Sequence, residues 1–421
     1  MANVSSSNGL EKRPKLRFPG FDEPWNTALL SDYFVKSTKK NSDGMISNVI
    51  CNSAKQGLIP QREYFDKDIA NSDNTNGYYI IESNDFVYNP RKSADAPYGP
   101  ISSYQYPEAG IVSPLYLCFR AKREINPFYF EWYFRSSTWH RYIYMSGDSG
   151  ARHDRVSIKD DVFFAMPINV PSAKEQERIS LFLDAIERRI ETQRTLVETL
   201  KKYKRGLSDT LFDRTAQSPS CKIVKLGDAF ELLQNNTFSR DDLTTNPSSV
   251  QNIHYGDVLV KYGAVANISE YTPPYIKPTI NLQKFVATSY LRDGDIVFAD
   301  TAEDYSVGKA TEIAGANGLA VLSGLHTIPC RPLMKFHPMY LAYYFNSSLF
   351  RRQIYPLVQG TKVSSISKGE LVKTSVYAPT ESEQRRIASM LYLLDLRITF
   401  EEKTVNALTN TRTALLQQLF I

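Results

Sequence analysis

The sequence predicts an α+β fold, in which two mixed α/β domains are separated by two long helices that form an antiparallel coiled coil, with a pseudo-two-fold internal repeat. Three observations predict it. A Pro…Glu-Gln-x-Arg-Ile segment that begins at Pro171 occurs again at Pro379, 208 residues later. Each copy continues into a long apolar heptad pattern. Each is preceded by short strand-like runs separated by Gly, Pro, Asn and Asp.

The two repeated segments have the periodicity of coiled-coil helices. In each copy the steps between apolar residues alternate between four and three, which is the seam of a heptad repeat. A proline at the start of each segment favours helix initiation. Helices of this length extend roughly 50–60 Å. The first seam is Ile179, Leu183, Ile186, Ile190, Gln193, Val197, Leu200, Lys204, Leu207 and Leu211, and the second, from Ile387 to Leu419, repeats every position 208 residues later.

Polar residues interrupt the seam at equivalent positions. Gln193 and Lys204 break the first copy, and Glu401 and Arg412 break the second. An antiparallel pairing places a positions against d positions, so it brings Lys204 to Glu401 and Gln193 to Arg412. A parallel pairing would bury Lys204 against Arg412, which is strongly unfavourable because both are cations. We therefore predict antiparallel packing with these two contacts.

The duplication also covers the globular stretches. Leu30, Asp32 and Phe34 recur 196 residues later at the start of the second stretch. An aromatic segment at 126–137 recurs at 337–348, and its spacing predicts a short buried helix in both. Between these anchors we expect strands at Tyr78–Ile81, Ile111–Phe119, Asp257–Val260, Asp295–Phe298 and Ala320–Leu322.

These patterns divide the chain into five parts. Residues 1–17 are polar and rich in serine, which predicts a disordered tail. The remaining parts are a first mixed domain at 18–170, a first long helix at 171–214, a second mixed domain at 221–378 and a second long helix at 379–421.

The composition is that of a globular protein with two or three domains. Of 421 residues, 42% are hydrophobic and 23% are charged. No run of 18 apolar residues occurs, so we expect no membrane span. The four cysteines form no CxxC pair, which is typical of buried thiols in a cytoplasmic protein. The net charge of +5 permits nucleic-acid binding without requiring it.

The sequence predicts no catalytic site and no metal site. Tyr271–Tyr275 is similar to the (Asp/Asn)-Pro-Pro-(Tyr/Phe) loop of amino-methyltransferases, but Thr272 is a weak acceptor, and no Gly-rich motif for S-adenosylmethionine occurs. No GxxxxGK(S/T) motif, GxSxG elbow or metal-ligand spacing of histidines occurs. The clustered acids are more typical of a solvated turn than of a nuclease; they are Asp295, Asp300, Glu303 and Asp304.

Glycine-containing loops late in each half are the best binding candidates. They span 145–155 and 358–365, and each lies between the short aromatic helix and the long helix. Small residues allow close backbone approach, and Arg, Lys, Gln, Ser and Thr contact bases and phosphates. The alternative is an ordinary solvated loop. With two other basic and aromatic stretches, the candidates for DNA binding are Arg91, Lys92, Ser149, Arg152, His153, Lys261, Tyr262, Gln359, Thr361 and Lys362.

The order of these segments resembles the specificity (S) subunit of Type I restriction–modification systems. The resemblance covers the chain beyond the tail. It depends on the opening segment 14–25, on the repeated Leu-x-Asp-x-Phe starts, and on the two Pro…Glu-Gln-x-Arg-Ile segments with their helices. Each motif alone is weak, whereas their duplicated order is specific.

The resemblance implies a non-catalytic DNA-recognition subunit. The mixed domains would be two target-recognition domains, each reading one half of a bipartite asymmetric target in double-stranded DNA, and the helices would be a spacer. Two methyltransferase (M) subunits would bind S-adenosylmethionine and methylate adenine, and motor-nuclease (R) subunits, which use ATP and Mg, would join for cleavage. Candidate contacts of the spacer with the M subunits are Glu175, Gln176, Arg178, Glu383, Gln384 and Arg386.

Two other classes of protein are open to test. A restriction enzyme fused to its own specificity module would need the motifs for S-adenosylmethionine and nuclease chemistry that are missing here. A coiled-coil adaptor that joins two protein partners without DNA would share the heptad seam. Such an adaptor would have no need of Arg and Lys in equivalent glycine loops.

Overall fold

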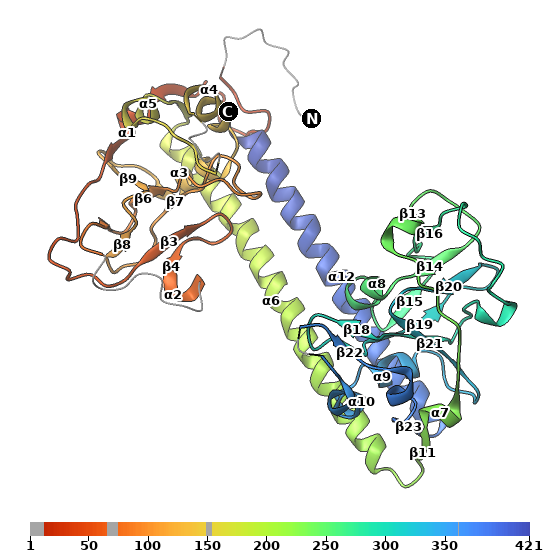
Figure 1. The fold of residues 1–421 in the computed structure, drawn as a ribbon. Helices are drawn as coiled ribbons and strands as arrows, with labels where there is room; N and C mark the ends of the chain where they lie inside the picture. Colours follow the sequence, from red (N-terminus) through yellow and green to blue (C-terminus); the bar gives the residue numbers. More distant parts are fainter. Residues whose placement is uncertain (1–11, 65–74, 149–153, 361) are drawn as a thin grey trace. The chain divides into compact units, whose positions relative to one another are not determined.

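The computed structural model describes residues 12–64, 75–148, 154–360 and 362–421 (Figure 1). Residue contacts divide the chain into two compact units. The first unit is the chain up to Arg194 together with Lys403–Ile421, and the second unit is Thr195–Glu402. Each unit therefore contains one globular part, the beginning of one long helix and the end of the other.

The globular part of the first unit consists of short strands and short helices. Its helices are α1 (Leu30–Tyr33), α2 (Gln61–Tyr64), α3 (Pro127–Arg135), α4 (His140–Ser146) and α5 (Asp160–Phe164). Its strands are β1 (Asn26–Leu29), β2 (Phe34–Lys36), β3 (Ile50–Ser53), β4 (Gly57–Pro60), β5 (Tyr79–Ile81), β6 (Phe86–Tyr88), β7 (Ile101–Ser103), β8 (Gly110–Val112), β9 (Leu117–Ala121) and β10 (Pro167–Val170). The main sheet is antiparallel in the order β2-β9-β6-β7, and two-stranded ladders join β1 to β10, β3 to β4 and β5 to β8.

The second unit has a related but larger globular part. Its helices are α7 (Leu226–Ala229), α8 (Tyr255–Val260), α9 (Tyr340–Phe345), α10 (Ser348–Ile354) and α11 (Lys368–Leu371), with 3₁₀ turns η2 (Arg240–Asp242), η3 (Ala287–Ser289) and η4 (Tyr355–Leu357). Its strands are β11 (Lys222–Lys225), β12 (Phe230–Leu232), β13 (Leu243–Thr244), β14 (Gln251–Ile253), β15 (Val265–Asn267), β16 (Tyr275–Ile276), β17 (Ile296–Ala299), β18 (Thr301–Ala302), β19 (Ala310–Ala314), β20 (Val321–Ser323), β21 (Thr327–Pro332), β22 (Ser364–Ser365) and β23 (Ser375–Ala378).

Two sheets and two small ladders organise these strands. One sheet has the order β12-β21-β17-β19-β15, and the other has the order β13-β16-β14-β20. Most neighbours are antiparallel, but β15 is parallel to β19 and β14 is parallel to β20. The ladders join β11 to β23 and β18 to β22. The mixed α and β content predicted for both halves is confirmed.

A central strand in each unit divides two hydrophobic cores. Along β6, the side chains of Phe86 and Tyr88 enter the core against the aromatic helix, while Val87 enters the core on the opposite face. Along β17, Ile296 and Phe298 alternate with Val297 and Ala299 in the same way. This alternation follows from the two-residue period of a strand. Both faces of these two strands are buried, so their sequences are continuous apolar runs.

The same buried ion pair holds the central strand in both units. Asp85, just before β6, accepts two hydrogen bonds of 2.6 Å from Arg120 of β9. Asp295, just before β17, accepts bonds of 2.9 and 2.7 Å from Arg331 of β21. The two carboxylates are almost fully buried. A buried carboxylate needs such a cation and hydrogen bonds, so the duplication preserved a structural constraint.

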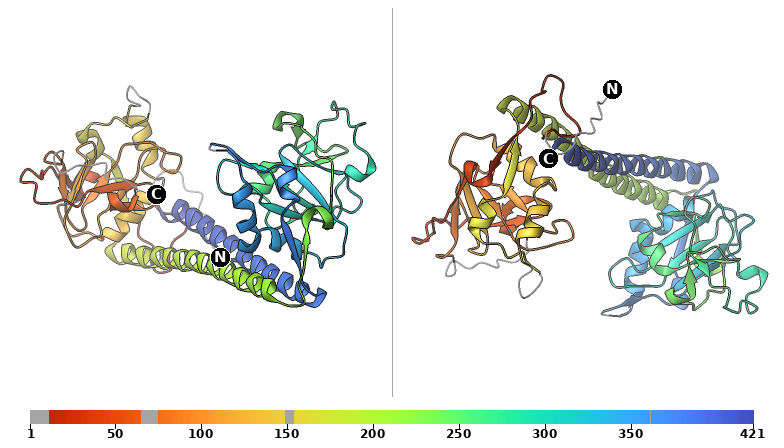
Figure 2. Two further views of the ribbon diagram at one scale, coloured as in Figure 1. Left: turned by 60° about the horizontal axis from the view of Figure 1, so that its bottom comes forward. Right: turned by 90° about the horizontal axis from the view of Figure 1, so that it is seen from above.

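The predicted aromatic helices are present as α3 and α9 (Figures 1 and 2). The Asn126 side chain caps the start of α3 by accepting from the Tyr129 N–H at 3.1 Å, and Pro127 occupies the first turn. In the second unit, Met339 precedes α9 in a left-handed conformation, with φ of 67°. The aromatic side chains of both helices pack into the core of their unit, except Phe128 of α3, which is 49% exposed.

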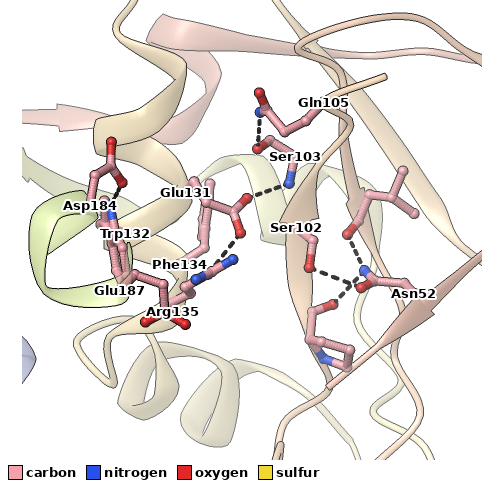
Figure 3. Close-up of polar contacts among 12 residues, drawn as sticks. Asn52, Ser102, Ser103, Gln105, Glu131, Trp132, Phe134, Arg135, Asp184 and Glu187 are labelled. Atoms are coloured by element: carbon pink, nitrogen blue, oxygen red, sulfur yellow. Dashed lines mark hydrogen bonds and ion pairs between the residues drawn. The ribbon is translucent and has the colours of Figure 1, made fainter. Parts of the chain in front are cut away.

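A glutamate joins each aromatic helix to its sheet. The glutamate belongs to the helix in the first unit and to the sheet in the second. In the first unit, Glu131 of α3 accepts from the backbone N–H of Ser103 in β7 at 2.5 Å (Figure 3). In the second unit, Glu312 of β19 accepts from the N–H groups of Met339 and Ala342 at 2.7 and 3.2 Å. Burial raises the pKa of Glu312 to about 7, although these two N–H groups oppose the shift.

The two long helices are α6 (Ala173–Gln217) and α12 (Glu381–Leu419). Every position of both predicted seams is buried or half-buried. In the first unit the beginning of α6 pairs with the end of α12, where Arg412 contacts Glu187 at 2.5 Å. In the second unit the end of α6 pairs with the beginning of α12, where Lys204 contacts Asp395 at 2.5 Å. The predicted antiparallel packing is confirmed.

The predicted partners of the polar seam residues are wrong. Lys204 pairs with Asp395 rather than Glu401, and Arg412 pairs with Glu187 rather than Gln193. Both acids stand one residue after a seam position, where a carboxylate stays partly in water. The side chains of Lys204 and Asp395 are 26% and 35% exposed. Because desolvating an ion pair is costly, a half-exposed acid is the better partner.

Two further predictions from the sequence are corrected. The expected tail at 1–17 is too long, since Arg17 makes two hydrogen bonds of 2.8 Å to Glu175, and Lys12 donates to Thr27 at 2.6 Å. Residues 1–11 lie outside the described residues. The expected strand at Asp257–Val260 is instead part of helix α8, which begins where the His254 ring accepts from the Gly256 N–H.

Replacing Arg331 by alanine should strongly destabilise the second unit. Asp295 is 2% exposed, and the substitution leaves its carboxylate buried without its hydrogen-bonded cation. We expect a loss of about 3–5 kcal/mol in the free energy of unfolding, measured by urea denaturation at pH 7. Lys335→Ala is the control, because the Lys335 side chain is 83% exposed, and it should change stability by less than about 0.5 kcal/mol. Equal effects of the two substitutions would contradict the assignment.

The contribution of Glu312 to stability should fall as the pH rises from about 4.5 to about 7. Within this window the unfolded chain loses the proton while the folded protein keeps it, so folding is favoured at the lower pH. We expect the free energy of unfolding of the wild type, minus that of Glu312→Gln, to decrease by about 3 kcal/mol across the window. Glu303→Gln, at an exposed position, is the control. A difference that stays constant with pH would refute the assignment.

Candidate nucleic-acid interface

In both units, the end of the glycine-containing loop pairs with the loop that follows the central strand. In the first unit, the Val156 N–H donates to Pro90 at 2.9 Å and the Lys92 N–H donates to Asp154 at 2.8 Å. In the second unit, the Ile366 N–H donates to Asp300 at 2.9 Å. We call these segments the paired loops: 89–92 with 154–157 in the first unit, and 299–302 with 359–360 and 362–366 in the second.

A glycine is required in the paired loops of the second unit. Gly360 has φ of 105°, and a Cβ atom at this position would lie 2.0 Å from the carbonyl oxygen of Val363. This close approach lets Gln359 and Ser365 exchange two backbone hydrogen bonds of 2.9 and 2.8 Å. Gly360 therefore serves a close contact within the loop itself. The predicted close approach of these glycine-containing loops to a ligand stays a prediction.

The paired loops of the first unit line a pocket of about 730 Å³. Four of its lining residues are basic, namely Lys55, Arg91, Lys92 and Arg155, and one, Asp95, is acidic. Lys55 lies 3.5 Å from Asp95. Among the residues that the structure describes, the side chains of Arg91, Lys92 and Arg155 have no hydrogen-bonded or ion-paired partner. Their charges are thus available to a polyanion.

The equivalent surface of the second unit has a different chemistry. The Thr301 hydroxyl donates to Asp300 at 2.7 Å and lies 3.3 Å from the ring of His326. Arg351 is engaged by backbone carbonyls, with a bond of 2.6 Å to Val307 and another to Tyr305. Lys362 is exposed. The conserved loop pairing therefore presents mostly cations in the first unit and mixed polar groups in the second.

The other predicted DNA-binding residues have different outcomes. Ser149, Arg152, His153 and Thr361 lie outside the described residues. Gln359 and Lys261 are exposed.

Tyr262 is not available as a surface contact. Its ring is 3% exposed and belongs to a hydrophobic core, and burial raises the pKa of its hydroxyl. The apolar contacts of this ring outweigh the polarity of its hydroxyl. The prediction of Tyr262 as a DNA-binding residue is therefore wrong.

Three of the six predicted spacer contacts are used inside the fold. Glu175 is buried against Arg17. The side chain of Gln176 donates to Pro171 at 3.0 Å, and that of Gln384 donates to Pro379 at 2.9 Å. The glutamine of each Glu-Gln pair therefore holds the start of its long helix, and Glu175 does so in the first copy alone, which corrects the assignment of these three residues to a partner surface.

The other three predicted spacer contacts remain accessible. Arg178 and Arg386 are exposed, and Glu383 is half-buried. Arg178 also lies over the ring of Phe18, at 5.9 Å.

Sequence reasoning missed two groups of surface residues. One is the turn Ala54–Gln56, which shares the basic pocket; its strands are too short for a clear alternation of apolar residues. The other is a set of apolar side chains that α12 exposes in the second unit, 37–63% exposed, at Met390, Tyr392, Leu393 and Leu396. Their sequence signal is that they are apolar residues of a long helix at positions outside its heptad seam.

The described residues contain no group of His, Cys, Asp and Glu that could hold a metal ion. The acid cluster is divided, because Asp295 is held by Arg331 while Glu303 and Asp304 face solvent. Burial, with the nearby Arg240, lowers the pKa of His254 to about 4. In the part of the chain that is described, no helix is long and apolar enough to cross a membrane.

Comparisons with known proteins find the same fold in solved structures. No family model and no curated protein matches the sequence. A chain from a study of complex assembly and conformational transition of the type I R-M system has 17% identity and a TM-score of 0.60, with 96% of this chain and 99% of that chain covered.

Two S subunits are also similar. The HsdS subunit from Thermoanaerobacter tengcongensis has 17% identity and a TM-score of 0.50, covering 96% of this chain and 97% of that one. The Type-I restriction-modification S subunit from M. genitalium has 14% identity and a TM-score of 0.52, covering 97% and 99%. The chain thus has the fold of type I S subunits over nearly its whole length.

Proposed function

We propose that this chain is the DNA sequence-recognition subunit of a Type I restriction–modification complex. The proposal depends on one observation. The fold of this chain, including both globular parts and both long helices, matches that of S subunits over nearly the whole length of each chain. Each globular part would read one half of a bipartite target in double-stranded DNA. The chain itself would be non-catalytic.

The paired loops support DNA binding by each unit. The first unit offers unpartnered cations around its pocket, and phosphate contacts from Arg and Lys position a protein on DNA. The second unit offers mixed polar groups at the equivalent place. Since sequence is read by polar groups at base edges, different side chains imply different half-sites. The target is therefore asymmetric.

Exposed apolar residues on the helices support docking of two M subunits. Contiguous exposed apolar side chains mark protein interaction sites. On α12 these include Tyr392, Leu393 and Leu396, and on the first turns of α6 they include Leu181 and Phe182. In this arrangement the M subunits bind S-adenosylmethionine and methylate adenine, and R subunits use ATP and Mg for cleavage.

Deleting the gene should remove one bipartite methylated-adenine motif from the methylome of the cell. The motif should return when the wild-type chain is supplied. A matched variant, Lys335→Ala, should restore it equally well, because Lys335 is remote from the paired loops in sequence and makes a weak surface ion pair. Persistence of every methylated motif after deletion would contradict the proposal.

A gel shift distinguishes DNA recognition from a protein adaptor. With M subunits present, the complex should bind duplexes that contain the motif more tightly than duplexes without it, at a stated salt concentration. Equal binding to both duplexes, or none, would favour the adaptor.

A further inference from the structure

The β3–β4 hairpin of the first unit projects beside the basic pocket. Its strands pair from Ile50 with Pro60 to Ser53 with Gly57, which leaves Ala54, Lys55 and Gln56 as the turn. All three turn residues are exposed. Gly57, with φ of 70°, begins the return strand. The Ser53 hydroxyl accepts from the N–H groups of Lys55 and Gln56 at 3.3 and 3.4 Å, so the turn is ordered by its own chain.

Buried hydrogen bonds fix this hairpin to the main sheet. Asn52 of β3 is 5% exposed. Its amide nitrogen donates to Val87 of β6 at 2.7 Å, and its amide oxygen accepts from Ser102 of β7 at 2.9 Å (Figure 3). The Asn89 side chain donates to the carbonyl of Asn52 at 3.2 Å. A fully bonded buried amide specifies one position, so the exposed turn is held rigidly.

The turn forms a ridge between two hollows of opposite charge. Gln56 lines the basic pocket and also lines a second hollow of about 370 Å³. The second hollow is lined by the acids Glu131, Asp184 and Glu187 and by one cation, Arg135 (Figure 3). Glu131 is paired with Arg135 and Glu187 with Arg412, so Asp184 supplies the uncompensated negative charge of this hollow. Phosphates would be repelled from the acidic side and attracted to the side of Arg91, Lys92 and Arg155. The ridge can therefore lie along a groove of DNA while the phosphates of one strand occupy the basic pocket.

We propose that this hairpin enters the major groove, with Gln56 as a specificity-determining residue, while Arg91, Lys92 and Arg155 hold the adjacent phosphates. The inference rests on the proposed function. The major groove admits a two-stranded β-ribbon, and a glutamine amide at its tip can bond two atoms of one base edge, most readily in adenine. Lys55 forms an ion pair with Asp95, so Gln56 is the polar side chain of the turn that remains for a base edge.

The test measures base preference with the full chain and its M subunits. Each base pair of the methylated motif is varied in turn, and methylation is followed on each duplex. Gln56→Ala should lower discrimination about 5- to 150-fold at one base pair of one half-site and leave the other half-site unchanged. Gln56→Glu should alter the preference at the same base pair. Gln417→Ala, at an exposed position of α12, should change nothing.

Uniform weakening across all duplexes by both Gln56 variants would overturn the base-reading role, as would unchanged discrimination at every base pair. Failure of the proposed function is distinct from these results, because the wild-type complex would then methylate no motif.

The proposed phosphate contacts are tested separately, by measuring how DNA binding depends on salt concentration. Arg91→Ala and Lys92→Ala should each reduce the slope of log K against log salt concentration by about 0.9, with no change in base preference. Lys122→Ala, an exposed lysine in the loop after β9, is the matched control and should leave the slope unchanged. Altered base preference with an unchanged slope would overturn the assignment of these residues to phosphates.

Discussion

The packing of each long helix's end on an aromatic helix is the contact on which the two units depend. The ring of Phe420 lies 5.6 Å from that of Tyr129, and the ring of Phe212 lies 6.0 Å from that of Tyr340. Each globular part completes its core with the last turns of a helix that starts in the other unit. Aromatic burial of this size is a major part of a domain's stability. A globular part without both helices would expose this core.

The two halves share their buried ion pairs, whereas the exposed residues of their loops differ. The carboxylates of Asp85 and Asp295 had to keep their arginines, because an unpaired charge in the core is strongly destabilising. The backbone pairing of the loops also persisted, since, apart from Gly360, it requires no particular residue. The exposed positions on these loops carried no such constraint. Arg91 and Thr301, which follow equivalent strands, therefore diverged in charge while the scaffold beneath them stayed the same.

The sequence predicted the elements that have a period and missed those that depend on contacts between distant segments. The long helices and their seam follow from ten positions spaced alternately four and three residues apart, eight of them apolar in each helix, and the direction of packing follows from charge. The partner of Lys204 could not be predicted, because a residue beside the seam reaches it as well as one within it. The Glu-Gln motif looked like a surface feature, yet Arg17 buries Glu175. The basic pocket required Arg91 and Arg155 to meet, which only the folded chain shows.

Each globular part begins and ends on a single ladder. Strand β1 pairs with β10 from Asn26 opposite Val170 to Leu29 opposite Pro167, and β11 pairs with β23 in the same manner. The chain thus leaves the helical framework and returns to it at one place. Everything between the two strands can be exchanged for another sequence of compatible core without altering where the framework begins. The ladder therefore sets the two ends of each globular part side by side, and the residues between them can change without moving the point where the chain meets its long helix.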